Sequence, residues 1–331
     1  MSNTNSSASA FGWDFQSNAA LVLMLKNIKR AVSVKVEGKT EDIEIILDNG
    51  TAIFSQAKSV FKPDDYTNVK AKMKASLGTL NESAKLSNIE KLIYVTNSPN
   101  PFNDVTSMSY FYGNSSYTFN SLPDSCQDAI NSIISEQSYD NINCEQLEVH
   151  VIPFVGDGEN RYKVMKEATY EFLHMVGINE SGLGKNILET WQRFLAINAS
   201  HHDLSAAVTK KKLIWPLIVS VCEISRDEAF FSAYDDGELN EISEKYKNAI
   251  NNNSERFEFI TKVMSSYNEH HDPDPKNRIK SFIETKWGSF SGEFDIEHIA
   301  PEILEAIVKL TLHKVLQNRF MVSRIKKEVN L

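Results

Sequence analysis

Cysteine is scarce in this chain, with three in 331 residues: Cys126, Cys144 and Cys222. Their separation does not match the ligand spacing of a zinc site, which excludes the common cysteine-based metal centres. We expect reduced, buried thiols, as is usual in cytoplasmic proteins.

Long hydrophobic runs are also missing. The longest, LIWPLIVSVC at 213–222, is too short to span a bilayer and contains Pro216. The opening MSNTNSSASA is polar and lacks the apolar segment of a signal peptide, so we expect a disordered tail over residues 1–10. The sequence predicts a cytoplasmic protein without membrane association.

Positive charge is in the minority: 35 Lys and Arg stand against 44 Asp and Glu, for a formal net charge of −9. Nonspecific binding to duplex DNA is driven by neutralisation of phosphates, so such a chain is a poor constitutive DNA binder. Contact with DNA would need local basic patches or partner proteins. The hydrophobic content of 41% is ample for one large domain or two smaller ones.

Residues 37–58, EGKTEDIEIILDNGTAIFSQAK, alternate between apolar and polar side chains, which predicts a β-hairpin of two half-buried strands. A two-residue turn at Asn49-Gly50 would place Asp42 opposite Ala57. A three-residue turn over 48–50, with Gly50 left-handed, places Asp42 opposite Gln56 instead. The apolar pattern favours the second register, because only that register turns Ile43, Ile45, Leu47, Ile53 and Ala57 inward together.

In this register Asp42, Glu44, Gln56 and Lys58 share one face, and Lys58 is a diagonal neighbour of Asp42. A carboxylate and an amide carbonyl can bind Mg²⁺, and an ammonium group can orient a water molecule or stabilise developing charge. The grouping is typical of a metal-dependent phosphodiesterase. The alternative is an ordinary amphipathic hairpin with a charged outer face.

The residues before the hairpin add further motifs. A helix from Asp14 has Gln16 in its first turn and a buried stripe of Leu21, Met24, Leu25 and Ile28, and a short strand follows at 32–36. Together, Gly12 with Gln16, the EGxxEDI segment from Glu37 to Ile43, and the QxK of 56–58 resemble the PD-(D/E)XK restriction-endonuclease-like superfamily, in the variant where QxK replaces (D/E)xK. The similarity is to the double-stranded-DNA nuclease family of CBASS (CD-NTase-associated) and Lamassu anti-phage effectors, above all the Lamassu nuclease subunit.

The resemblance implies roles for five residues. Asp42 and Lys58 would be the essential pair and Gln56 the third member, while Glu37 and Gln16 would bind metal or position water. It implies Mg²⁺, or Mn²⁺ in its place, held by Asp42, Gln56 and Glu37. Alternatives remain for three positions: Gln16 as a helix cap or surface residue, Glu37 as the end of a strand, and Glu44 as a solvated side chain.

Downstream, the pattern predicts further elements of the same domain: a lysine-rich helix at 65–88, a buried strand at 91–98, a long aromatic-rich loop at 99–125, a helix near 124–137 and a strand at 148–154. The helix carries Lys70, Lys72, Lys74 and Lys85, which either follow DNA phosphates or are simply solvated. From Asn160 the chain is predicted to be helical, with segments near 224–233, 238–265, 276–285 and 297–328. The Lys210–Lys212 run is expected to be a solvated turn of helix, with contact to DNA or to an acidic face of a partner subunit as the alternative.

We therefore expect an α/β fold: a restriction-endonuclease-like core (αβββαβ, a mixed sheet flanked by helices) over residues 11–200 and an all-helical domain over 201–331. The helical domain would serve partner binding or oligomerisation, although the helix at 301–327 is equally compatible with plain core packing.

The expected function is Mg²⁺-dependent endonucleolytic cleavage of double-stranded DNA by a defence effector subunit. The resemblance implies an SMC-like ATPase partner that keeps the enzyme silent, a further small defence subunit, and activation by self-assembly into a homo-oligomer. Two alternatives stay open: a stand-alone restriction or repair nuclease, and a catalytically inactive nuclease-like scaffold.

Overall fold

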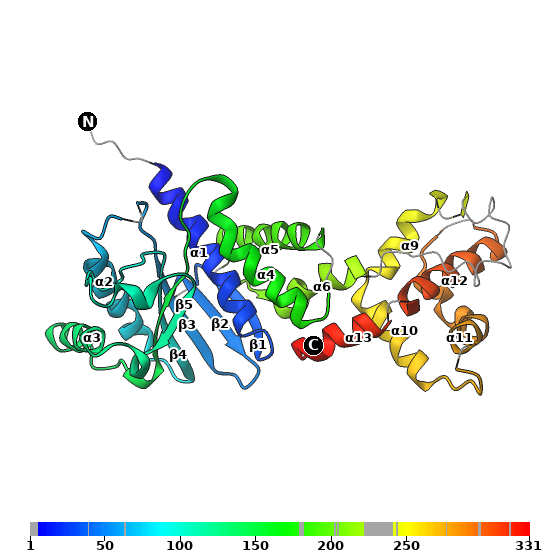
Figure 1. Cartoon of the computed structure of the whole chain (residues 1–331). Helices are drawn as coiled ribbons and strands as arrows, with labels where there is room; N and C mark the ends of the chain where they lie inside the picture. Colours follow the sequence, from blue (N-terminus) through cyan, green and yellow to red (C-terminus); the bar gives the residue numbers. More distant parts are fainter. Residues whose placement is uncertain are drawn as a thin grey trace. The chain divides into compact units, whose positions relative to one another are not determined.

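A computed structural model of the chain describes residues 6–38, 40–62, 64–178, 182–201, 203, 205–221, 241–242, 244–275, 277–296, 299–317 and 319–331. The chain divides into two compact units (Figure 1). One comprises residues 1–213 together with 328–331, and the other comprises 214–327. The predicted helical segment at 224–233 lies outside the described residues.

The first unit is α/β. Its helices and strands are, in chain order, α1 (Ser6–Lys26), β1 (Ala31–Val36), β2 (Ile43–Leu47), β3 (Ala52–Lys58), α2 (Val69–Ser83), β4 (Ile89–Thr96), β5 (Ser115–Thr118), α3 (Asp124–Gln137), β6 (Leu147–Val151), α4 (Lys163–Met175), α5 (Leu183–Ala199) and β7 (Val208–Thr209). The helix α6 (Lys210–Val221) contains the division between the units. The first six elements follow the order expected from the sequence.

The described strands form one mixed sheet in the order β5-β6-β4-β3-β2-β1-β7. The strands β1, β2 and β3 form an antiparallel meander, and β4 is parallel to both β3 and β6. Ile43 pairs with Ser55, the β2–β3 turn closes through the Leu47 N–H to the Thr51 carbonyl (2.9 Å), and Gly50 has φ 79°. The three-residue turn and the register predicted from the apolar pattern are therefore confirmed.

Helices cover both faces of the sheet. The helices α1, α4 and α5 pack together on one face, and α2 and α3 lie on the other (Figure 1). On the second face Phe54 of β3 and Tyr94 of β4 join Met73 and Leu77 of α2 in one apolar cluster. Burial on both faces makes the half-buried reading of β3 wrong: every residue from Ala52 to Ala57 is buried, the polar Gln56 included.

Two other expectations about the helices differ in detail. The segment 6–10, predicted to be disordered, lies in α1. The predicted apolar stripe of α1 is too narrow, because Ala19 to Met24 are all 0% exposed between the sheet and the neighbouring helices. A helix enclosed on all sides needs apolar residues all round.

The predicted loop 99–125 contains the additional strand β5, which pairs antiparallel with β6. Its aromatic residues divide between two roles. Phe102, Phe111 and Phe119 are buried in the cluster with α2 and α3, whereas Tyr110 and Tyr112 are exposed. Packing of the smaller core thus accounts for much of the aromatic content.

Lys210 does not face solvent as expected. Its side chain is buried, and its ammonium donates to the main-chain carbonyls of Lys29 (3.2 Å), Val329 (2.8 Å) and Asn330 (3.3 Å). These bonds attach the last residues of the chain to the first unit.

The second unit is helical. It contains α9 (Lys247–Ser254), α10 (Phe257–Glu269), α11 (Arg278–Lys286), α12 (Pro301–Gln317) and most of α13 (Arg319–Val329). The helix α12 contacts α9, α10 and α11, and Ile307, Leu312 and Leu316 are fully buried. These three residues pack within the helical unit, and the predicted role of the helix in partner binding or oligomerisation stays a prediction.

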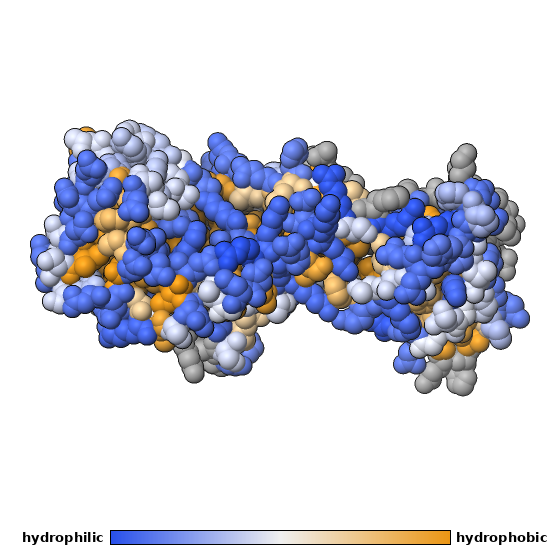
Figure 2. Space-filling view, turned by 90° about the horizontal axis from the view of Figure 1, so that it is seen from below, coloured by the Kyte–Doolittle hydropathy of each residue, from blue (hydrophilic) through white to orange (hydrophobic). Residues whose placement is uncertain are grey.

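The face of the molecule shown in Figure 2 is mainly hydrophilic. On this face, apolar residues form small separate patches among hydrophilic ones. No helix within the described residues is both long and apolar enough to cross a membrane.

Candidate functional site

The candidate site is built on the loop 37–42 between β1 and β2. Two main-chain bonds close this loop: the Glu37 N–H donates to the Asp42 carbonyl (2.8 Å), and the Gly38 N–H to the Glu41 carbonyl (3.0 Å). Glu37 has φ 57°, an uncommon conformation for a residue with a side chain, and it turns the chain out of β1. The tight turn places Asp42 immediately before β2, at the end of the sheet where the neighbouring strand β3 finishes.

Glu44 has a structural role in this loop. Its Oε1 accepts hydrogen bonds from the Thr40 hydroxyl (2.9 Å) and N–H (3.3 Å), and its Oε2 lies 3.4 Å from the Lys35 ammonium. A Cβ at Gly38 would lie 2.1 Å from Glu44 Oε1, so a larger residue at this position would have to displace the Glu44 carboxylate. Glu44 is buried and its hydrogen bonds hold the loop, so the alternative of a solvated side chain is excluded.

Asp42 and Lys58 form an ion pair across the hairpin. Asp42 Oδ2 accepts from Lys58 Nζ (3.0 Å) and from the Ala57 N–H (3.0 Å). The Lys58 side chain is 33% exposed and that of Asp42 19%. The pair lies at the carboxyl end of β3, and both side chains are half-buried and accessible to solvent.

Gln56 does not bond to Asp42, although the register places it opposite. Its Nε2 donates to Glu41 Oε2 (2.6 Å), and the Ser83 hydroxyl at the end of α2 donates to Glu41 Oε1 (2.5 Å). Burial raises the pKa of Glu41 to about 7, with a further rise from the charge of Asp42, against the lowering effects of Ser83, Gln56 and Lys58.

Glu41 is the site residue that sequence reasoning missed. It stands beside Asp42 in the EDI motif, so a signal was present. The alternation argument assigned Asp42 but not Glu41, and both residues lie in the loop before β2, where the strand period of two does not hold. Its partner Ser83 is distant in sequence and is positioned only by the packing of α2 on the sheet.

Gln16 and Glu37 both reach the site through the main chain of Asp42. The Gln16 Nε2 of α1 donates to the Asp42 carbonyl (3.0 Å), which also accepts the Glu37 N–H. The helix α1 begins at Ser6, so Gln16 lies in its middle and is buried there. The predicted place in the first turn is therefore wrong, and neither a helix cap nor a surface residue describes Gln16. The half-buried Glu37 side chain makes no hydrogen bond within the described part of the chain, so its predicted role as a metal ligand stays a prediction.

The donor set is small but chemically suited to Mg²⁺. Among the described residues, no group of three or more His, Cys, Asp and Glu side chains is placed to hold a metal ion. Asp42 Oδ1 and Gln56 Oε1 accept no hydrogen bond from any described residue. Mg²⁺ prefers oxygen ligands and is often bound by one or two carboxylates, with water and substrate phosphate completing its shell. These two oxygens fit that pattern.

The lysines of α2 differ in their environments. Lys72 donates to the Ser59 carbonyl just after β3, and burial lowers its pKa, with Asp65 raising it and Lys58 lowering it further. Lys70 and Lys74 are exposed. Only these two, one helical turn apart, are available on α2 itself for an external anion.

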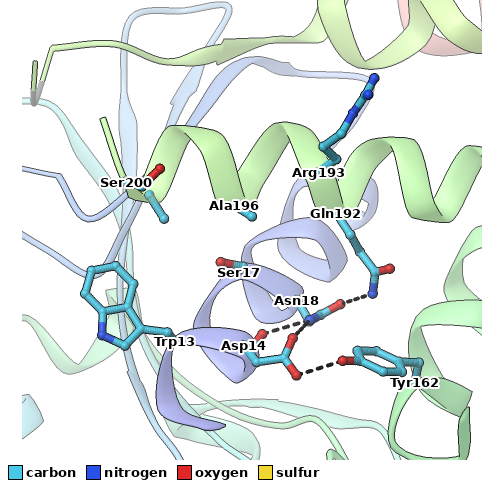
Figure 3. A pocket seen from close by; sticks show the side chains of 10 residues that line it. Trp13, Asp14, Ser17, Asn18, Tyr162, Gln192, Arg193, Ala196 and Ser200 are labelled. Carbon is cyan, nitrogen blue, oxygen red and sulfur yellow. Dashed lines mark hydrogen bonds between the residues drawn. The ribbon is translucent and has the colours of Figure 1, made fainter. Parts of the chain in front are cut away.

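A separate pocket of about 460 Å³ lies between α1 and α5 (Figure 3). Its polar groups mostly bond to one another. Asp14 accepts from the Tyr162 hydroxyl (2.8 Å) and from Asn18 Nδ2 (2.9 Å), and Asn18 Oδ1 accepts from Gln192 (2.7 Å). None of the predicted site residues lines this pocket, so the candidate chemistry lies elsewhere.

Comparisons with known proteins do not establish a family. No protein-family model matches the chain, and no curated protein does. Among solved structures, the chain is similar to the Cap4 SAVED/CARF-domain containing receptor of Acinetobacter baumannii, with the cyclic trinucleotide 3′3′3′-cAAA (11% identity) and with 2′3′3′-cAAA (10% identity). Each match has a TM-score of 0.40 and covers 78% of this chain. The chain spans 58% of the receptor's length, and a similarity of this degree does not identify a function.

Proposed function

We propose that the α/β unit is a Mg²⁺-dependent nuclease that hydrolyses phosphodiester bonds in double-stranded DNA. The observation that carries the proposal is the solvent-accessible Asp42–Lys58 ion pair at the carboxyl end of β3, with Gln56 beside it. An acid, an amide and a lysine in this order are the elements of the PD-(D/E)XK pattern in its QxK variant.

The topology supports the same proposal. The succession α1-β1-β2-β3-α2-β4 and the mixed sheet flanked by helices agree with a restriction-endonuclease-like core. In such a core the acid precedes the second strand and the lysine ends the third. Asp42 and Lys58 occupy these places.

The chemistry assigns each side chain a role. Bound Mg²⁺ would polarise the phosphoryl group and lower the pKa of a coordinated water. Asp42 Oδ1 and the Gln56 carbonyl oxygen would hold the ion. The Lys58 ammonium, kept in place by Asp42, would orient the attacking water and stabilise negative charge on the phosphoryl oxygens. The water oxygen bonds to phosphorus as the opposite P–O bond breaks, giving a phosphate monoester and a hydroxyl group.

We further propose that the nuclease is the effector subunit of an anti-phage defence complex, on the basis of the sequence resemblance to Lamassu effectors. Unrestrained cleavage of duplex DNA would destroy the host chromosome, so an SMC-like ATPase would hold the subunit inactive, a small third subunit would complete the complex, and release would allow self-assembly. The apolar face of α12 is occupied within the helical unit, so partner contacts would use the surface of that unit.

Plasmid cleavage by the purified protein tests the proposal. We expect linear and nicked products with Mg²⁺ or Mn²⁺, none with EDTA, and a rate that rises more than linearly with protein concentration. If the protein alone is inactive, the assay is repeated with co-purified partners and linear DNA ends. Absence of cleavage under all these conditions would contradict the proposal and favour an inactive scaffold.

A further inference from the structure

A chain of hydrogen bonds lies behind the Asp42–Lys58 pair. Ser83 of α2 donates to Glu41 Oε1, and Gln56 of β3 donates to Glu41 Oε2. All three residues are at most 3% exposed. Because they come from a loop, a strand and a helix, their arrangement depends on the folded core and is rigidly held.

This arrangement decides how the Gln56 amide is oriented. An amide has a donor end and an acceptor end, whereas an ionised carboxylate only accepts. With Nε2 bonded to Glu41, Gln56 Oε1 is the end turned away from this carboxylate. Rotation of the amide by half a turn would place two oxygens against each other in a buried site, which is costly.

We propose that Glu41 is a positioning residue that fixes the Gln56 amide so that its carbonyl oxygen is available to a divalent cation bound by Asp42. The inference rests on the proposed function for the identity of the cation. The contact also explains why position 56 has an amide, where the commoner form of the pattern has a carboxylate. Because the neighbouring Glu41 is already an acid, the residue at 56 must donate a hydrogen bond to it.

The two positions are therefore coupled. Gln56→Glu alone would bring two carboxylates to hydrogen-bond distance in a buried site, which is strongly unfavourable for like charges. Glu41→Gln alone would leave two amides, and the new amide could accept from Nε2 or donate to Oε1 of Gln56, so the orientation is no longer fixed. The exchange Glu41→Gln with Gln56→Glu restores one donor facing one carboxylate.

Thermal unfolding of the four proteins at pH 8 in EDTA tests the pairing without any need for activity. We expect Gln56→Glu to lower the Tm of the α/β unit by roughly 5–10 °C and the exchanged pair to recover most of this loss. Gln56→Glu combined with Glu44→Gln is the matched control, since Glu44 is a buried carboxylate of the neighbouring strand β2 that accepts a hydrogen bond from Thr40. This control should show no recovery.

Calorimetric titration with Mn²⁺ tests the positioning role, which a purely structural pair would not affect. We expect Glu41→Gln to bind Mn²⁺ about 10- to 100-fold more weakly than wild type and the exchanged pair to bind it at least as well as wild type. Equal recovery by the Glu44→Gln control would overturn the pairing, and unchanged Mn²⁺ affinity in Glu41→Gln would overturn the positioning role. A wild-type protein that neither binds Mn²⁺ nor cleaves DNA would instead refute the proposed function before any variant is compared.

Discussion

Lys58 Nζ lies 3.0 Å from Asp42 Oδ2, and this contact joins the last residue of β3 to the residue preceding β2. The same oxygen accepts the Ala57 N–H, which leaves the second carboxylate oxygen for other partners. The pair is accessible to solvent, whereas Glu41 and Gln56 are buried. The site therefore consists of a half-buried, solvent-accessible pair and a fully buried support.

Asp42→Asn should lower Mg²⁺-dependent DNA cleavage by about 100-fold or more, because it removes the only charge proposed to bind the cation and hold Lys58. The substitution preserves size, so the far-UV spectrum and Tm should change little. Asp48→Asn, a change to an exposed carboxylate in the β2–β3 turn, is the control. Equal activity of the two variants would place the site elsewhere.

The stability of the α/β unit should depend on pH through Glu41. Its pKa is about 7 in the fold and 4.5 ordinarily, so between these values the unfolded chain has lost a proton that the folded chain retains. The stability that Glu41 contributes is therefore fully present below pH 4.5, is lost as pH rises to about 7, and does not change further above that. The difference is on the order of 3 kcal/mol.

Denaturant unfolding in EDTA at pH 5 and pH 8 measures this effect. The Glu41→Gln variant should lose much less stability than wild type over the same interval, since it has no proton to release at this position. A wild-type protein whose loss of stability matches that of the variant would show that Glu41 is ionised in the fold at pH 5.

Gln16→Leu should separate anchoring of the loop from general stability. The side chain donates one hydrogen bond to the Asp42 carbonyl, so its loss should cost about 1 kcal/mol of unfolding free energy. Gln192→Leu removes a bond of the same type, to Asn18 in the α1–α5 pocket, and should cost a similar amount. Only Gln16→Leu should also reduce the cleavage rate, and an equal reduction by both would remove Gln16 from the site.

Lys70 and Lys74 should contribute to DNA binding through phosphate contacts. Replacement of both by Glu should weaken binding and reduce the slope of log affinity against log salt by about 2. The same change at Lys163 and Lys166 of α4, which pair with acidic neighbours, is the control. A salt dependence that falls equally in the two double variants would mean that α2 does not face the DNA.

The sequence was sufficient to predict the hairpin and its register, because a shift of one residue would have turned Ile43, Ile45 and Ile53 out of the core. It was also sufficient for the order of the first six elements. The burial of Gln56 could not be predicted in the same way, because it depends on α2, which covers the outer face of β3 and is held there by contacts distant in sequence.

Long-range contacts also explain the other misjudged residues. Lys210 resembles a surface lysine in sequence, yet it is buried because three main-chain carbonyls converge on it, all of them more than a hundred residues away. Glu41 was passed over because its role requires Ser83 and Gln56 together. Local patterns identify elements, but they do not reveal which polar residues satisfy one another across the fold.

A single-turnover assay on end-labelled duplex DNA shows whether Lys58 acts directly in phosphodiester cleavage. Wild type, Lys58→Ala and Lys163→Ala are compared with Mg²⁺ and with EDTA, after equal Tm values and equal oligomeric states have been verified. We expect Lys58→Ala to lose Mg²⁺-dependent cleavage. Lys163 is an exposed lysine of α4, so Lys163→Ala should cut DNA like wild type. Cleavage by Lys58→Ala at the wild-type rate would contradict a direct role of Lys58.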